Sequence, residues 1–265
     1  MIGIIYLSGL DLLIASGLVL LAAGISLALR LGLEGRLLMA AGRATVQLAL
    51  LGLVLGFVFE SESGLVIAGL MVCMASIAGV EAVRRSERRV KGLFPTSIGV
   101  MLVSSMCVTL FGLTAVIDLP GPWYTPQYAI PILGMILGNA LNGISLGLDT
   151  ALEGFERDRK LVELLLAHGA TRRQAAAPVV RRAVRTGTIP ILNAMIAVGI
   201  ISIPGMLTGQ LLAGEDPAEA VRYQLFILFA ITGGVALGTM GVVLGVTRLV
   251  FDERDRLRLD WIKRV

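Results

Sequence analysis

The chain has 265 residues, of which 56% are hydrophobic and 16% are charged. Soluble globular domains carry about a quarter charged residues, so this composition excludes an ordinary soluble protein and predicts an all-α integral membrane protein, with one domain over residues 1–265. The net charge of +4 does not indicate a nucleic-acid partner, because the basic residues flank apolar segments, as they do in membrane proteins.

Seven apolar stretches are each long enough to cross a lipid bilayer as a helix, which takes roughly 20 residues. They predict a polytopic helical bundle, because such continuous runs lack the alternating pattern of barrel strands. In an alternative with six crossings, the first stretch lies in the membrane interface. The stretches cover residues 9–29, 37–59, 64–83, 97–117, 128–150, 188–213 and 220–250.

The basic residues predict the orientation of this bundle. With the N-terminus outside and the C-terminus inside, 22 of the 23 Lys and Arg residues lie on the cytoplasmic side, and only Arg222 lies opposite. Loops rich in Lys and Arg stay in the cytoplasm, so we expect an N-out, C-in protein.

One long polar segment, residues 153–187, contains eight Lys or Arg. Residues 161–168 have the pattern of a short helix, and Thr171 with Gln174 has the spacing of a capping box. A second short helix is therefore expected after a turn at Gly169. Two interpretations stay open: the segment docks into a groove of a soluble partner, or it lies on anionic lipid headgroups.

Polar residues recur on one face of the predicted fifth span, at Asn139, Asn142, Ser145 and Asp149. Spacings of three and four residues place them together on a helix. Polar groups in hydrocarbon are costly, so this face points either into a substrate pathway or toward hydrogen-bonding partners on a neighbouring helix.

The predicted sixth span combines polar residues with a helix-breaking Pro-Gly pair. Asn193, Ser202, Pro204, Thr208 and Gln210 all fall inside it. Broken helices in membranes often line transport sites, although a simple kink is the alternative.

Glycines four positions apart predict close helix contacts, either inside one subunit or at a dimer seam. The pairs are Gly134 with Gly138, Gly143 with Gly147, Gly234 with Gly238, and Gly241 with Gly245.

No metal site can be assigned from the residues. His168 is the only histidine and is expected on the docking surface, while Asp149 is the one hard ligand near the predicted pathway. The chain also has no G-x-x-x-x-G-K-[ST] loop, so we expect no nucleotide cofactor bound by that route in this chain.

A family resemblance is carried by four stretches, residues 130–149, 163–175, 202–214 and 220–224. They resemble the FetB-like permease family, which also contains the membrane subunits of plant aluminium-tolerance ABC transporters. The spacing of Glu163 and Gly169 also resembles the first half of the EAA loop of ABC importer permeases, but Arg181 and Arg182 stand where that pattern has Leu-Pro.

The resemblance implies a permease subunit of an ABC transporter, homodimeric and located in the inner (plasma) membrane, that exports iron while a separate ATPase subunit binds ATP and Mg²⁺. Alternatives are an ABC permease for another substrate such as a nucleotide sugar, an ATPase-independent transporter, or an intramembrane enzyme. The residues expected to contact the ATPase are Glu163, His168, Gly169, Thr171, Arg172, Arg173 and Gln174.

Overall fold

The structure is a computed structural model that describes residues 8–60 and 63–264. These residues form two compact units. The first comprises the described residues up to 60 together with Leu212–Gly214, and the second comprises the others.

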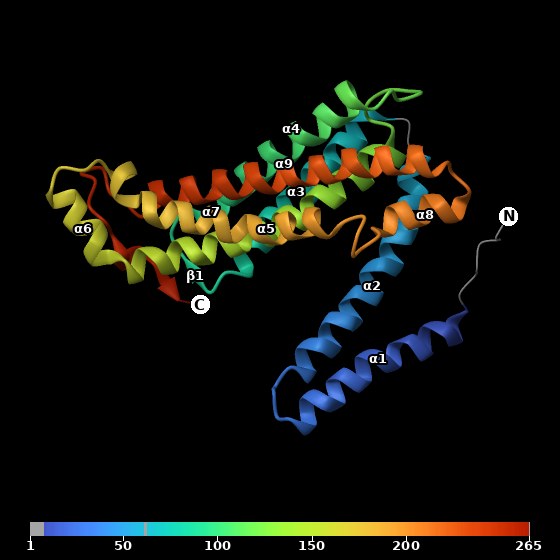
Figure 1. Cartoon of the computed structure of the whole chain (residues 1–265), viewed down its shortest axis with the longest axis horizontal. Coiled ribbons are helices and arrows are strands. Elements are labelled where there is room, and N and C mark those ends of the chain that lie inside the picture. Colours follow the sequence, from blue (N-terminus) through green and yellow to red (C-terminus); the bar gives the residue numbers. More distant parts are fainter. Residues whose placement is uncertain (1–7, 61–62, 265) are drawn as a thin grey trace. The chain divides into compact units, whose positions relative to one another are not determined.

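The first unit is a helical hairpin of α1 (Gly9–Ala28) and α2 (Glu34–Phe59) (Figure 1). The Ser26 hydroxyl donates to Glu34 at 2.9 Å and accepts from the Leu33 N–H at 3.0 Å, which fixes the turn between the helices. Most of the apolar side chains of both helices are exposed. Helices that are apolar on all sides are typical of membrane spans.

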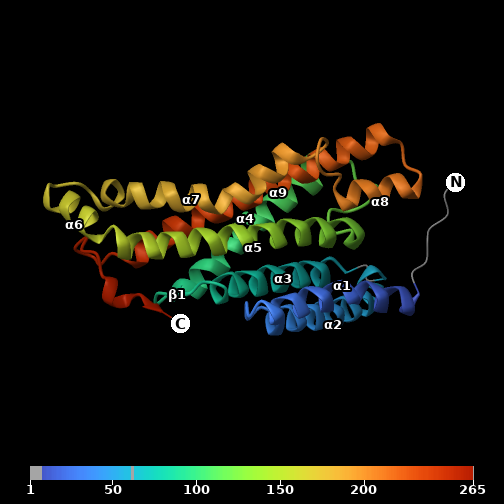
Figure 2. The same cartoon turned by 60° about the horizontal axis from the view of Figure 1, so that its bottom comes forward.

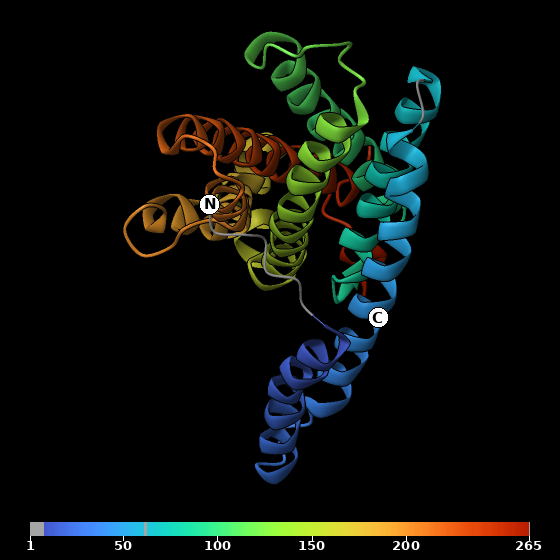
Figure 3. The ribbon, with the colours of Figure 1, turned by 90° about the vertical axis from the view of Figure 1, so that its right-hand side faces the viewer.

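The second unit is a bundle built around α5. Figures 2 and 3 show α5 between α3 on one side and α7 with α9 on the other. Its large side chains are fully buried at Ile136, Ile144, Leu148 and Phe155. The elements are α3 (Gly64–Arg84), β1 (Arg88–Arg89), α4 (Leu93–Phe111) with a π-helical turn (Gly112–Val116), α5 (Pro126–Arg157), α6 (Arg159–Ala167), α7 (Arg172–Ala197), α8 (Gly205–Ala213), α9 (Pro217–Leu249), a 3₁₀ turn (Leu259–Trp261) and β2 (Lys263–Arg264).

Close helix contacts in the bundle depend on glycine. A Cβ atom at Gly143 would lie 2.8 Å from the Gly187 carbonyl oxygen and 2.8 Å from Val235 Cγ1, so α7 and α9 both touch the α5 backbone there. By contrast, a Cβ at Gly138 meets nothing within 4 Å. The predicted glycine contacts are thus formed inside one chain at Gly143, but not at Gly138.

Six helices in the described part of the chain are long and apolar enough to cross a membrane. They are α1, α2, α3, α4 with its π-helical turn, α5 and α9, and they confirm the polytopic all-α fold. The N-out, C-in orientation stays a prediction.

The predicted span 188–213 is not one helix. α7 ends at Ala197 and the nine-residue α8 begins at Gly205. Between them Gly199 has φ +82°, and the N–H groups of Ile201 and Ser202 both donate to the Ala197 carbonyl. The break was expected at Pro204, but the chain leaves the helix six residues earlier, because a turn closes on Ala197.

The prediction of a second short helix after Gly169 is also wrong. It is the first part of α7, which runs for 26 residues. The helix continues although Gly187 and Pro190 both disfavour a helix interior, and the structure accommodates both residues within it.

Candidate functional site

The α6–α7 elbow, residues 163–174, has the cap that the sequence predicts. The Thr171 N–H donates to Gln174 Oε1 at 2.9 Å, and the Gln174 N–H donates to Thr171 Oγ1 at 3.4 Å. Gly169 makes the turn with φ +86°, a conformation that favours glycine. His168 Nδ1 lies 2.8 Å from the Leu164 carbonyl oxygen. The elbow is therefore a defined turn with local hydrogen bonds.

The outer face of α6 is a candidate docking surface. Leu161 and Leu164 are 46% and 55% exposed, while Val162 anchors the helix in the core. Glu163 pairs with Arg159 at 2.7 Å, and both side chains are exposed. Exposed leucines beside charged residues suit the groove of a soluble partner. Contact with an ATPase stays a prediction for these residues.

Two of the predicted docking residues line a groove. Arg172 and Arg173 line a groove of about 580 Å³ between α7 and α9, together with Arg181 and Arg248. Arg172 Nη1 lies 3.5 Å from the carboxylate of Asp255. Sequence spacing could not predict the groove or the Arg172–Asp255 pair, because both depend on where α9 ends beside α7.

The C-terminal segment, residues 250–264, joins parts of one end of the bundle that lie far apart in the sequence. β2 pairs with β1 in antiparallel register, with Arg88 opposite Arg264. Glu156 Oε2 accepts from Arg88 at 3.0 Å and from Arg264 at 3.5 Å. Figure 1 shows α6, β1 and the C-terminus at the same end of the bundle. The segment thus ties the α3–α4 connection to the end of α5.

This segment is folded locally by Asp252 and anchored by aromatic packing. The Arg256 backbone N–H donates to Asp252 and holds the pKa of that carboxyl below its ordinary value, with a further bond from the Arg256 side chain at 2.8 Å. The buried Phe251 ring packs edge-on against Phe155, with centroids 6.0 Å apart. Sequence reasoning missed the segment, and its only signal was two aromatic residues in a charged tail, Phe251 and Trp261.

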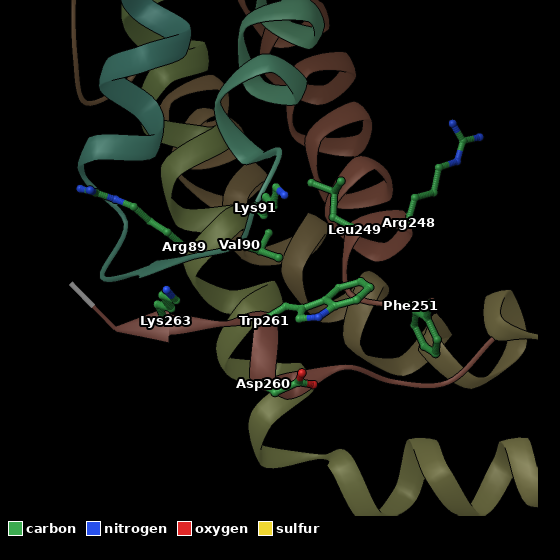
Figure 4. Close-up of a pocket in the computed structure, with 9 residues that line it drawn as sticks. All are labelled: Arg89, Val90, Lys91, Arg248, Leu249, Phe251, Asp260, Trp261 and Lys263. Atoms are coloured by element: carbon green, nitrogen blue, oxygen red, sulfur yellow. The ribbon is translucent and has the colours of Figure 1, made fainter. Parts of the chain in front are cut away.

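A cavity of about 850 Å³ lies between the end of α9, β1 and the C-terminal segment. Figure 4 shows Trp261 below Val90 and Leu249, whereas Arg89 and Arg248 extend away from them in opposite directions. The walls that face one another are therefore mostly apolar, and the cations do not converge on a common point.

The polar face of α5 is largely occupied by hydrogen bonds to α3. Asn142 Oδ1 accepts from Arg85 Nη1 at 3.0 Å. The Ser145 hydroxyl lies 3.1 Å from the Ala82 carbonyl of α3 and 2.8 Å from the Leu141 carbonyl of its own helix, so its one proton is shared between them. These bonds agree with the alternative in which the face holds two helices together.

Asp149 continues this pattern just beyond the C-terminal end of α3. Its Oδ1 accepts from the Ser86 hydroxyl at 2.9 Å and from the Glu87 N–H at 3.1 Å. Asn139, by contrast, is exposed and donates to the Met135 carbonyl of its own helix at 2.9 Å. Of the four, only Asn139 has no hydrogen bond to α3 or to the loop that follows it.

No metal centre can be built from the described residues, since they contain no group of three or more His, Cys, Asp or Glu able to hold an ion. Asp149 has no second hard ligand in such a group. Its carboxylate, on α5, accepts hydrogen bonds from Ser86 and Glu87 in the loop that follows α3.

The other predicted pathway residues lie on α7, on α8 and in the turn between these two helices. Asn193, Ser202 and Thr208 are exposed, and Thr208 donates to the Pro204 carbonyl at 3.2 Å. Gln210 Oε1 is buried and has no hydrogen-bond partner among the described residues. Within the described ranges, no hydrogen bond joins this set to the polar face of α5.

Comparison with known proteins places these features in a family. Residues 9–251 match the family described as Uncharacterised protein family (UPF0014). The chain belongs to UPF0014. The match runs across both units, and it confirms the resemblance found in the sequence, because the relatives include FetB and plant proteins.

The UPF0014 relatives cover most of this chain. A UPF0014 membrane protein of Synechocystis is 39% identical over 86% of this chain and 87% of its own length. The Arabidopsis thaliana protein ALUMINUM SENSITIVE 3 is 33% identical over 84% of this chain and 80% of its own. The probable iron export permease protein FetB of Escherichia coli is 28% identical over 96% of both chains. No solved structure matches the chain.

Asp149 gives a test of the α3–α5 junction in this UPF0014 protein. Replacing it with alanine leaves the Glu87 N–H without its acceptor and leaves the Ser86 hydroxyl only the Arg88 carbonyl to donate to, so the unfolding free energy should fall by about 1–3 kcal/mol. Thermal unfolding in detergent measures this effect. Asp149→Asn keeps an acceptor oxygen and should lose less. Unchanged stability with reduced transport would instead support a place in the substrate pathway.

Proposed function

We propose that this chain is the permease subunit of an ABC transporter that exports iron from the cytoplasm and is driven by a separate ATPase subunit. The relative named probable iron export permease protein FetB, which aligns with this chain over 96% of both lengths, supports the substrate and its direction. The sequence lacks a P-loop, so a second protein must supply ATP hydrolysis.

One observation carries the proposal: α7 connects the elbow to the broken segment without interruption. At 1.5 Å per residue, its 26 residues span about 39 Å. One end is capped beside the exposed α6, and the other ends at the turn 198–204, inside an apolar stretch. A push on the elbow by an ATPase therefore moves the backbone at membrane depth.

The same turn supports a homodimer in the inner (plasma) membrane. Ile200 and Ile201 are 89% and 83% exposed, and the backbone around them is not helical. Non-helical backbone in hydrocarbon needs cover from protein or from a water-filled cavity, because lipid cannot satisfy its polar groups. A second copy that packs against residues 198–204 supplies that cover beside a shared central path.

Co-purification of this chain with an endogenous ATPase tests the assembly. Native mass spectrometry should find two permease chains and two ATPase chains. In proteoliposomes the complex should move iron only with ATP and Mg²⁺, with iron(II), an iron chelate and a nucleotide sugar compared as substrates. ATP-independent iron transport by the permease alone would contradict the proposal, and transport of the nucleotide sugar alone would replace iron as the substrate.

A further inference from the structure

The groove between α7 and α9 has a pronounced charge asymmetry. Arg172, Arg173, Arg181 and Arg248 line it, and no acidic residue does. Arg172 has a partner in Asp255, at 3.5 Å. No salt bridge to a carboxylate is found for the other three within residues 8–60 and 63–264. The site thus holds at least three positive charges that its own fold does not neutralise.

The shape of the groove comes from small residues between the arginines. Ala176, Ala177 and Val180 form the α7 wall, and Leu244 with Thr247 forms the α9 wall. Positions 172, 173, 176, 177, 180 and 181 repeat with helical spacing, so they share one face of α7. Short side chains in the middle leave room for a ligand, and the guanidinium groups border it.

The groove lies where both helices change from charged to apolar. Arg185 is the last charged residue of α7, and Arg248 is the first charged residue after the apolar part of α9. Beyond the groove, Leu237, Met240 and Leu244 form an exposed stripe on α9, 52%, 45% and 54% exposed. An amphiphile can therefore place an anionic head in the groove and its chains along this stripe.

We infer that the groove binds the headgroup of an anionic phospholipid, with the phosphate between Arg181 and Arg248. Guanidinium groups bind phosphate oxygens through paired hydrogen bonds, and basic residues next to a membrane span attract anionic lipid. Charge complementarity and the adjoining apolar stripe support a lipid, whereas a soluble anion would not need the stripe. This site is separate from the proposed transport function and needs neither ATPase nor substrate.

The experiment measures lipid binding by the purified full-length chain with native mass spectrometry. Phosphatidylglycerol, phosphatidylcholine and inorganic phosphate are the probes. The double variant Arg181→Gln/Arg248→Gln should bind phosphatidylglycerol about 30-fold more weakly, because each arginine near the membrane surface contributes about fivefold. The control Arg84→Gln/Arg157→Gln removes the same charge elsewhere on the chain and should bind as the unchanged protein does. Arg181→Lys/Arg248→Lys should keep most of the affinity.

Several outcomes would overturn the inference. They are equal binding of phosphatidylcholine, equal loss in the control variant, or inorganic phosphate binding as tightly as the lipid. If the Arg→Gln pair binds phosphatidylglycerol normally but loses the ATPase, the groove is a protein-docking surface. Equal melting temperatures of the variants establish that any lost binding does not come from unfolding.

Discussion

Replacing Gly143 by alanine is expected to lower the unfolding free energy of the bundle by about 1–3 kcal/mol. The new methyl group would lie 2.8 Å from the Gly187 carbonyl oxygen and 2.8 Å from Val235 Cγ1. The carbonyl belongs to the backbone of α7, so it cannot rotate away as a side chain could. The helices must separate, and this loosens contacts along α5, α7 and α9. Thermal unfolding in detergent measures the loss.

Gly138→Ala is the matched control on the same helix, because its Cβ would meet nothing within 4 Å. Alanine favours a helix over glycine, so stability should stay constant or rise by up to about 1 kcal/mol. If Gly143→Ala and Gly138→Ala lose the same stability, the effect of glycine in α5 comes from helix propensity or from contact with lipid. The close approach of α7 would then not be the cause.

Replacing Gly169 by valine is expected to uncouple ATP hydrolysis from transport in the proposed complex. At φ +86° a side chain costs about 1–2 kcal/mol. This cost lowers the population of the elbow conformation relative to other conformations by about 5- to 30-fold. No atom lies within 4 Å of the added Cβ, so the bundle itself should remain folded. Iron transported per ATP hydrolysed in proteoliposomes should fall by a similar factor.

Gly169→Asn separates backbone strain from bulk, because asparagine tolerates positive φ better than valine. It should keep most of the coupling. Normal binding and normal coupling in Gly169→Val would show that the elbow does not contact the ATPase. If neither Gly169→Val nor Gly169→Asn gives a folded permease, Gly169 is needed for folding, and these variants do not report on coupling.

Local chemistry made parts of the fold predictable. The six helices that are long and apolar enough to cross a membrane were predicted with their ends correct to about four residues, except that α5 runs to Arg157, beyond the predicted end at 150. Hydrocarbon requires a continuous run of apolar side chains, and such a run can be read from the sequence. The Thr171–Gln174 cap was predictable for a similar reason, since its donors and acceptors lie three residues apart in the sequence. Its continuation through Gly187 and Pro190 was not, because both residues locally disfavour a helix interior, and the sequence does not show that α7 packs against α5 and α9 there.

The sequence alone therefore determined the membrane-embedded helical character of this protein, the elbow at Gly169 and the family resemblance, all of which depend on neighbouring residues. Only the tertiary structure decided the partners of distant residues. It joined Asp149 to Ser86, placed Arg181 and Arg248 on the same groove, and paired Arg88 with Arg264 in a two-stranded sheet. These contacts depend on how helices pack, and packing distances are not encoded in any short stretch of sequence.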